Sequence, residues 1–244
     1  MKIIKLNAID STNTYLKEAS KNVTLEDGIV VVTNKQTEGR GQMGAKWQSK
    51  EGLSLSFSVF KRFDALSINE QSCISFVVSV GVKNALQKLQ IPEVSIKWPN
   101  DILSYQKKLC GILIENQLEG NKIISSVIGI GLNVNETEFQ ELPFATSMKL
   151  ASGNSYNLDE VLQIVFEEVL KELLSVENSE TLSVKKKYEA DLFRIDRVSV
   201  FENSEGYQFN GIIRGITNTG KLKVEIENET IQVYGLKEIK MLFS

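Results

Sequence analysis

The sequence predicts an α+β protein in which helices back a mixed β-sheet and a small β-barrel follows. Two observations lead to this class. Residues 53–59 alternate polar and apolar side chains as a half-buried strand does, whereas residues 69–89 repeat apolar side chains with helical spacing. Beyond Leu192 the chain contains short strand-like runs separated by turn residues. A chain of 244 residues, 42% of them hydrophobic, is long enough for one large core and a small second unit.

The first half of the chain predicts strands around two helices. Polar residues at positions 10–13 offer caps for a helix through Leu16. The helix at 69–89 ends before Pro92 and is expected to cover the sheet. Strands are predicted at residues 3–6, 28–33 and 53–59, and a hairpin is predicted from 94–103 and 109–114 with a short connection at 104–106.

The second half of the chain adds a strand at 122–135, two helices and the small barrel. Asn157 and Glu160 form a capping box for the first helix, which runs through Leu170, and the second helix runs through Tyr188. Short strands are predicted at 198–201, 211–216, 221–226 and 230–234, with a hairpin turn at 218–220. We expect two domains, residues 1–191 and residues 192–244. The second should dock on the first because so short a chain buries little core alone.

Composition excludes several classes of protein. The chain has no histidine, which removes Ser-His-Asp and Cys-His nucleophile systems and His-ligated zinc or iron. Cys73 and Cys110 lie in apolar runs and are expected to be reduced core residues. The net charge of −3 comes from 28 basic and 31 acidic residues without a cationic block, which gives no sign of nucleic-acid binding. With no signal peptide and no apolar run long enough to span a membrane, a cytoplasmic location is expected.

Charged residues interrupt the apolar pattern at 97–101, Lys-Trp-Pro-Asn-Asp, and again at 107–108, Lys-Lys. Pro99 has no backbone N–H, so the first strand must stop, bulge or reach an edge there. The two charged clusters would then face each other across the hairpin. Buried charges need compensation, and two interpretations remain open. The segment either binds an anion or contains an internal ion pair from Lys97 or Lys108 to Asp101.

Residues 39–44, Gly-Arg-Gly-Gln-Met-Gly, match the G-x-G-x-x-G pattern of dinucleotide-binding folds. The strand at 53–59 follows instead of a helix, so a Rossmann unit is rejected. The loop could still curl its backbone N–H groups around an anion, with Arg40 and Lys46 adding positive charge. The alternative is an ordinary hairpin loop.

For several polar or aromatic residues two roles are open, either ligand binding or support of the structure. Trp47 either stacks on a ring of a ligand or packs in the core. The other residues of this kind either bind a neutral polar ligand or serve as caps, turn residues or strand ends. They are Ser11, Thr12, Asn13, Gln36 and Asn133.

The order and type of these segments resemble the biotin protein ligases, also called holocarboxylase synthetases. The resemblance covers nearly the whole chain and rests on five motifs. They are D-S-T-N at 10–13, G-R-G-Q-M-G-A-K-W at 39–47, K-W-P-N-D at 97–101, K-L-C-G-I-L-I-E at 108–115 and G-I-G-L-N at 129–133. Any single motif is weak, whereas five in this order are specific.

The resemblance implies an SH3-like fold for the barrel and a two-step reaction. Biotin and ATP would give biotinyl-5′-AMP and pyrophosphate. A lysine of a biotin carboxyl carrier protein domain would then take the biotinyl group and release AMP. The resemblance also implies that Mg²⁺ enters with ATP and lies near Asp101, without a cage of protein ligands.

By the same resemblance, the biotin contacts would be Ser11, Thr12, Asn13, Gln36, Gly39, Arg40, Lys108 and Gly111, and the nucleotide contacts Gly41, Gln42, Trp47, Asn100 and Asn133. Lys108, Arg40 and Asp101 are the expected catalytic residues. Negative charge gathers at the α-phosphate in adenylate formation, and Lys108 and Arg40 would stabilise it without covalent participation. Asp101 would accept the proton that the carrier lysine must lose.

The sequence departs from the family pattern at two points. Gln42 and Ala45 stand where members often carry basic residues, so we expect the adenylate to escape faster than from a relative with arginine there. No helix-turn-helix region precedes the D-S-T-N motif, so DNA binding is not expected. Some members are homodimers, and a homodimer is compatible with the resemblance.

Three other functions compete with the ligase. They are a non-catalytic sensor of biotin or nucleotide, a lipoate ligase on the related fold, and an RNA-binding module in the barrel. The presence of Lys108 and Arg40 favours an enzyme over a sensor, and the motif at 97–101 favours biotin over lipoate. The barrel has mixed charges and no aromatic cluster, which disfavours RNA binding.

Overall fold

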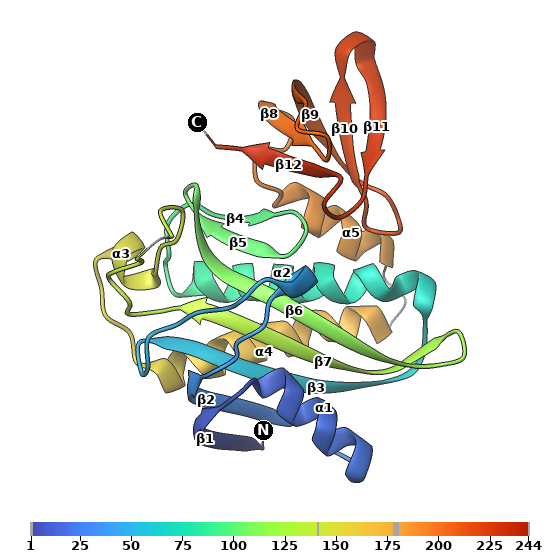
Figure 1. Ribbon diagram of the computed structural model, residues 1–244. Helices are drawn as coiled ribbons and strands as arrows, with labels where there is room; N and C mark the ends of the chain where they lie inside the picture. Colours follow the sequence, from blue (N-terminus) through green and yellow to red (C-terminus); the bar gives the residue numbers. More distant parts are fainter. Residues whose placement is uncertain (1, 141, 178–180, 244) are drawn as a thin grey trace.

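The structure is a computed structural model that describes residues 2–140, 142–177 and 181–243. Two β-sheets form its framework (Figure 1). The larger has seven strands in the order β1-β2-β3-β7-β6-β5-β4. β1 and β2 are parallel and all other neighbours are antiparallel, so the sheet is mixed. Its strands are β1 (Ile3–Ile9), β2 (Val30–Gln36), β3 (Ser54–Ser67), β4 (Val94–Lys97), β5 (Asp101–Ser104), β6 (Lys107–Glu119) and β7 (Lys122–Asn133).

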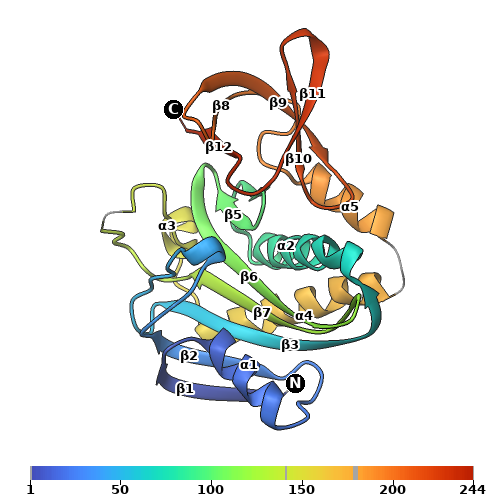
Figure 2. The same ribbon diagram turned by 45° about the vertical axis from the view of Figure 1, so that its right-hand side comes forward.

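Helices lie on both faces of the larger sheet. α2 (Gln71–Lys88) and α4 (Leu158–Glu177) pack together on one face, and α5 (Thr181–Ala190) packs on α2 (Figure 2). α1 (Thr12–Asn22) lies on the opposite face against β3 and β7. The loop between β2 and β3 crosses this second face over β6 (Figure 1). The candidate site described below lies between this loop and the start of α1.

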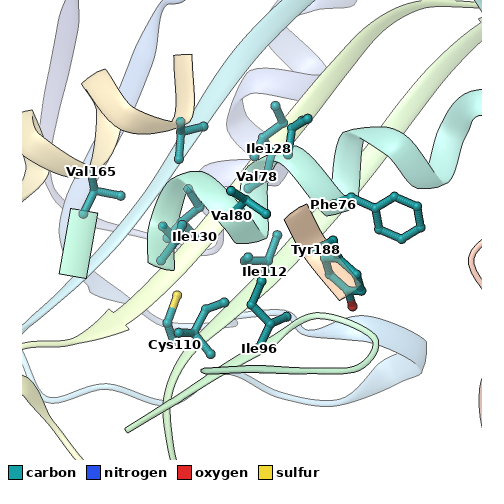
Figure 3. Packing of buried hydrophobic residues seen from close by; sticks show 14 of the residues in the cluster. Phe76, Val78, Val80, Ile96, Cys110, Ile112, Ile128, Ile130, Val165 and Tyr188 are labelled. Atoms are coloured by element: carbon teal, nitrogen blue, oxygen red, sulfur yellow. The ribbon is translucent and has the colours of Figure 1, made fainter. Parts of the chain in front are cut away.

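The apolar pattern of the sequence accounts for this layering. Val30 and Val32 of β2 enter the core under α2 and α4, whereas Val31 enters the smaller cluster under α1, because successive strand residues point to opposite faces. Tyr188 of α5 is fully buried and packs on Phe76 of α2, with ring centroids 4.6 Å apart. Figure 3 shows side chains of α2 and of the central strands meeting in the main core, among them Val78, Val80, Ile112, Ile128 and Ile130.

The second sheet contains the C-terminal strands in the order β11-β10-β9-β8-β12, all antiparallel. Its strands are β8 (Val198–Asn203), β9 (Gln208–Ile216), β10 (Leu222–Ile226), β11 (Thr230–Tyr234) and β12 (Ile239–Leu242). The turn between β9 and β10 contacts the larger unit. Trp98 Nε1 donates a hydrogen bond to the carbonyl of Gly220 at 2.8 Å, and Ser72 Oγ donates to the carbonyl of Asn218 at 3.1 Å.

The charged segment 97–101 connects two edge elements of the larger sheet. β4 ends at Lys97, β5 begins at Asp101, and β4 is the last strand in the sheet. Its outer side pairs with the segment after α5, where the Ile96 N–H donates to Asp191 O at 2.8 Å and the Phe193 N–H donates to Ile96 O at 2.7 Å. The prediction that the strand stops or reaches an edge near Pro99 is therefore confirmed, as is the hairpin that follows.

Most other predicted elements are confirmed, several with longer bounds. Asn157 Oδ1 accepts hydrogen bonds from the backbone N–H groups of Asp159 and Glu160, which caps α4. The sequence does not predict α3 (Met148–Ser152) or β12, because five and four residues are too few to display a period. Pairing with β8 is what makes β12 a strand.

The expectation for the two cysteines is confirmed by the structure. Cys73 and Cys110 are free and buried, as predicted. Burial also raises the pKa of both thiols above the ordinary value, so neither is a reactive thiolate. Among the described residues, no helix has the length and apolar content that crossing a membrane requires.

Candidate active site

A cavity of about 200 Å³ lies on the α1 face of the larger sheet. Its walls come from the start of α1, the end of β2, the loop after β2, and the strands β5, β6 and β7. Three of these segments meet because β5, β6 and β7 are neighbours in the sheet. Asp101 lies beside Gly111, and Gly111 lies beside Gly131.

One end of the cavity is a buried hydrogen-bonded cluster. Gln36 Oε1 accepts from the backbone N–H of Thr12 at 2.9 Å, and Thr12 Oγ1 lies 2.7 Å from Ser58 Oγ. Ser58 Oγ in turn donates to Asn13 Oδ1 at 2.6 Å. Ser11 caps α1 through its side chain, which accepts from the N–H of Thr14, so its capping role is confirmed. The cluster presents fixed donors and acceptors to a neutral polar group of a ligand.

The middle of the cavity has a floor made of glycines. Gly111 and Gly131 are paired, and the Trp47 indole lies directly on them. A Cβ at Gly131 would overlap the indole ring, and a Cβ at Gly111 would lie 3.3 Å from it. Trp47 Nε1 is buried and has no hydrogen-bond partner among the described residues. The Trp47 indole therefore packs directly on the sheet, because the two glycines beneath it have no side chain. Trp47 also forms part of the cavity wall.

The other end of the cavity carries an ion pair. Lys108 Nζ lies 2.6 Å from Asp101 Oδ1, and the two side chains are 40% and 19% exposed. Lys108 Nζ also lies 6.0 Å from the centre of the Trp47 ring. The predicted ion pair to Asp101 is therefore formed by Lys108. Because Lys108 still lines the cavity, the pair does not exclude the alternative prediction of an anion site.

The loop after β2 is a hairpin that closes one wall. The Gly41 N–H donates to Ala45 O at 2.7 Å, and the Trp47 N–H donates to Gly39 O at 2.9 Å. These amides are used within the loop, so for them the hairpin interpretation holds and the anion-cradle interpretation does not. Gly39 is needed for this closure because a Cβ there would overlap the carbonyl of Trp47. Arg40 reaches away from the loop to Glu115 of β6, with 2.6 Å between Nη2 and Oε1.

A second cavity of about 830 Å³ adjoins the first and shares Lys46, Trp47, Asp101 and Lys108 with it. Lys97 and Lys240 of β12 add positive charge to its lining. Burial lowers the pKa of Lys97 below its ordinary value; Asp101 opposes this shift, and Lys108 and Lys240 increase it. The Lys97 ammonium lies 4.7 Å from the centre of the Phe243 ring. This arrangement of cations suits a ligand with several negative charges.

Most of the predicted site residues come together at these two cavities. The first is lined by Ser11, Thr12, Asn13, Gln36, Arg40, Gly41, Gln42, Trp47, Asn100, Asp101, Lys108 and Gly111. Gly39 is not part of its lining and acts through the loop. Asn133 lines the second cavity, where its Nδ2 donates to Thr146 O at 2.9 Å and its buried Oδ1 has no partner among the described residues. Asn100 also has a structural role, since its Nδ2 donates to Ile112 O at 2.7 Å.

The structure adds residues that the sequence did not single out. Ser58 completes the buried cluster, and Gly129 leaves the space that Asn13 occupies. Ser58 has a sequence signal, because Ser54, Ser56 and Ser58 are the polar positions of an alternating strand and so share the face opposite the core. For Glu115 the sequence offers one signal, its position at the end of the motif at 108–115.

The linings of the two cavities indicate the kind of ligand that the site suits. Fixed hydrogen-bonding groups at one end and several cations at the other suit a small ligand that carries both a neutral polar group and an anionic group. Residues 6–133 match the model of the biotin/lipoate A/B protein ligase family. The chain belongs to this family, and within it the similarity is to the biotin protein ligases.

Curated relatives agree with this family. The bifunctional ligase/repressor BirA of Bacillus spizizenii is 35% identical over 166 residues, which are 66% of this chain and 50% of the relative. The biotin–[acetyl-CoA-carboxylase] ligase of Mycobacterium tuberculosis is 26% identical over 226 residues, which are 91% of this chain and 83% of the relative. The chain spans about half the length of the Bacillus relative that it matches.

A solved structure supports the fold over the whole chain. The biotin protein ligase from Aquifex aeolicus in complex with biotin and ATP superposes with a TM-score of 0.80 and 28% sequence identity. The match covers 100% of this chain and 99% of that chain. The predicted α+β class, with a mixed sheet backed by helices and a small antiparallel β unit, is confirmed.

Proposed function

We propose that this protein is an ATP-dependent biotin ligase that works through biotinyl-5′-AMP. The observation that carries the proposal is the pair of adjoining cavities, which joins the buried cluster around Asn13 to the ion pair of Lys108 and Asp101 across Trp47. In this proposal residues 1–191 bind both substrates and residues 192–244 complete the nucleotide side. The family match and the Aquifex aeolicus complex with biotin and ATP support the two ligands.

The biotin end of the proposal rests on hydrogen-bonding complementarity. The ureido ring of biotin has two N–H donors and one carbonyl acceptor in a fixed geometry. Thr12, Asn13, Gln36 and Ser58 supply hydroxyl and amide groups that are already ordered by one another. Preorganised groups of this kind lose little entropy on binding. The valeryl chain would then run along Gly111 toward Lys108.

The nucleotide end rests on charge and on Trp47. Adenine would pack on the indole, and the phosphates would lie among the lysines that line the second cavity. Asn133 and Asp101 both line that cavity, and Asn133 Oδ1 is a buried acceptor without a partner among the described residues. Their side-chain oxygens fit Mg²⁺, which is commonly held by one or two protein oxygens and substrate phosphates. Mg²⁺ bound there would neutralise phosphate charge.

In the first step a carboxylate oxygen of biotin would attack the α-phosphorus of ATP, the bond to the bridging oxygen would break, and pyrophosphate would leave. Negative charge grows at the α-phosphate during this step. A cation about 4 Å away in a partly screened site contributes a gross Coulomb attraction of roughly 4 kcal/mol. Lys108 suits this role because it lines both cavities and Asp101 holds its ammonium group there.

In the second step the amine of a carrier lysine would attack the acyl carbon of the adenylate, and the bond from that carbon to the phosphate oxygen would break. AMP leaves, and the carrier lysine gives up a proton. Asp101 is the carboxylate that lines both cavities, so we assign it as the proton acceptor. A biotin carboxyl carrier protein domain is the partner that this step requires.

Exchange of labelled pyrophosphate into ATP tests the proposal. We expect exchange in the presence of biotin and none with lipoate or without an added acid. Exchange with lipoate alone would make the protein a lipoate ligase. Exchange that needs neither acid would overturn the assignment, and biotin binding without exchange would identify a non-catalytic sensor.

Lys108→Ala should lower the exchange rate by roughly 10²–10³-fold, since the loss of one preorganised electrostatic group at a reacting centre has effects of that size. The matched control is Lys107→Ala, because Lys107 is the exposed neighbour in β6 and lines neither cavity. The control should retain the exchange rate. A normal rate in Lys108→Ala would contradict the role of Lys108.

A further inference from the structure

Glu115 of β6 lies at a junction between three parts of the site. Its carboxylate is 2.8 Å from Lys17 Nζ, 2.6 Å from Arg40 Nη2 and 3.1 Å from Asn13 Nδ2. The Glu115 side chain is only 17% exposed, whereas Lys17 and Arg40 are 50% and 43% exposed. Three donors therefore surround one largely buried carboxylate, and charge-assisted hydrogen bonds of this kind are stronger than neutral ones.

The first consequence of this arrangement concerns Asn13. Its Nδ2 group donates to Glu115 and to the carbonyl of Leu113, at 3.1 and 3.3 Å. Two acceptors on one side fix the direction of the amide, so Oδ1 points to Ser58. Gly129 provides the room for this direction, since a Cβ there would overlap Oδ1. Glu115 therefore helps to orient a residue at the polar end of the cavity.

The second consequence concerns the loop 39–47. Its backbone hydrogen bonds run within the loop and close the hairpin on itself. Arg40 extends from it to Glu115 on the sheet and lies 3.5 Å from Thr14 Oγ1 of α1. The bond to Glu115 is the shorter and is charge-assisted on both sides. It therefore ties this wall of the cavity to β6, alongside the packing of Trp47 on Gly111 and Gly131.

We infer that Glu115 is a positioning residue that couples the loop 39–47 to the orientation of Asn13. The inference rests on the proposed function, because that proposal places Asn13 at the ureido ring of bound biotin. Lys17 shares the carboxylate with Arg40, so the three side chains together carry one net positive charge, and of the two cations Arg40 lines the cavity. Arg40 thus remains able to attract a ligand carboxylate while it holds the loop.

The pKa of Glu115 agrees with this geometry. Burial alone would raise it, but the hydrogen bonds from Lys17, Asn13 and Arg40 together hold it below the ordinary value. The carboxylate is therefore ionised at neutral pH, as an anchor for Arg40 must be.

Hydrogen exchange of the protein without biotin tests the link to the loop. Glu115→Gln keeps the shape and an acceptor for Asn13 but removes the charge that holds Arg40. We expect amide exchange in residues 39–47 to become roughly ten- to a hundredfold faster, the factor that corresponds to a lost hydrogen bond to a charged group. Lys17→Gln is the matched control, because it removes the other cation from the same carboxylate, and it should leave exchange in the loop unchanged.

A double-variant measurement separates positioning from a general loss of structure. Glu115→Gln should weaken biotin binding roughly tenfold, measured by calorimetry. In an Arg40→Ala background the same substitution should change the affinity less than about twofold, because the group that it positions is gone. A structural defect would instead lower the affinity by the same factor in both backgrounds.

The two measurements also separate this inference from the proposed function. If the wild-type protein does not bind biotin, the ligase proposal fails, yet the exchange comparison still reports on Glu115 and the loop. Unchanged exchange in Glu115→Gln would overturn the inference, and so would additive losses of affinity in the double variant. Thermal unfolding of each variant shows whether the fold is retained.

Discussion

Two cations that line the first cavity lie in ion pairs whose carboxylates come from the sheet. Lys108 pairs with Asp101, and Arg40 pairs with Glu115, each at 2.6 Å. A partly buried cation is costly without such a partner. At the level of single residues the site therefore holds its charges in place before an anionic ligand arrives.

Asp101→Asn should slow transfer of biotin from preformed biotinyl-5′-AMP to the carrier lysine. The expected decrease is roughly 10²–10⁴-fold, the usual contribution of a general base. The rate should recover as the pH is raised toward the pKa of the free lysine amine, which separates loss of a base from misfolding. Asp159→Asn is a control, because Asp159 pairs with Lys5 outside both cavities. Unchanged transfer in Asp101→Asn would refute the role of Asp101 as proton acceptor.

At the level of elements, the packing of α2 on α4 determines how firmly the sheet is supported. Gly81 of α2 meets the backbone of α4, where an added Cβ would lie 2.7 Å from the Cα of Val169 and 3.0 Å from the carbonyl of Glu168. The sequence predicts both helices from their apolar spacing. It does not predict that Gly81 is the point of contact, because that depends on the angle at which the helices cross.

Gly81→Ala should lower the free energy of unfolding by about 1–3 kcal/mol, the cost of overpacking a close contact, although alanine favours helix. Chemical denaturation gives this value. Pyrophosphate exchange per folded molecule should not change, since Gly81 lies under the face of the sheet opposite the cavities. Ser79→Ala is the control on the same helix and should be neutral or stabilising, because its buried hydroxyl has no partner among the described residues. Equal stability of Gly81→Ala and wild type would contradict this account.

At the level of the whole molecule, the segment 97–101 joins the two sheets as well as lining the cavities. Trp98 donates to Gly220 of the C-terminal unit, and Tyr188 Oη donates to the carbonyl of Pro99 at 3.1 Å. On its other side the same segment carries Asn100 and Asp101 into the cavity. Trp98 thus anchors the residues that face the ligand, and Lys97 lies with Lys240 and Phe243 where the two units meet.

Trp98→Phe should lower the free energy of unfolding by about 0.5–1.5 kcal/mol, because it removes the hydrogen bond to Gly220 but keeps an aromatic ring. It should also raise the KM for ATP more than the KM for biotin, since the segment borders the second cavity. Trp47→Phe is the matched control for stability, because the Trp47 Nε1 group has no partner among the described residues. The measurements are denaturation and exchange kinetics. Equal effects on both KM values would contradict the proposed link to the nucleotide side.

The types of most elements, the breaks between them and the functional groups available can be inferred from the sequence alone. Apolar periodicity predicted α2 and β3, Pro99 marked the end of β4, and the lack of histidine excluded chemistry that needs an imidazole. Most of the residues that the five motifs select line the two cavities, and their roles there stay predictions. The element types and breaks depend on residues that are close along the chain, so a local sequence pattern is enough to predict them.

The pairing of charged and aromatic groups depends instead on how the chain packs in three dimensions. Spacing left Lys97 and Lys108 as equal partners for Asp101, and the structure gives the ion pair to Lys108 although Lys97 is the residue opposite Asp101 in the register of β4 with β5. The packing of Trp47 on Gly131 and of Arg40 on Glu115 joins segments distant in the sequence. Such contacts follow from strand register and from the path of a loop over the sheet, and no periodicity encodes either.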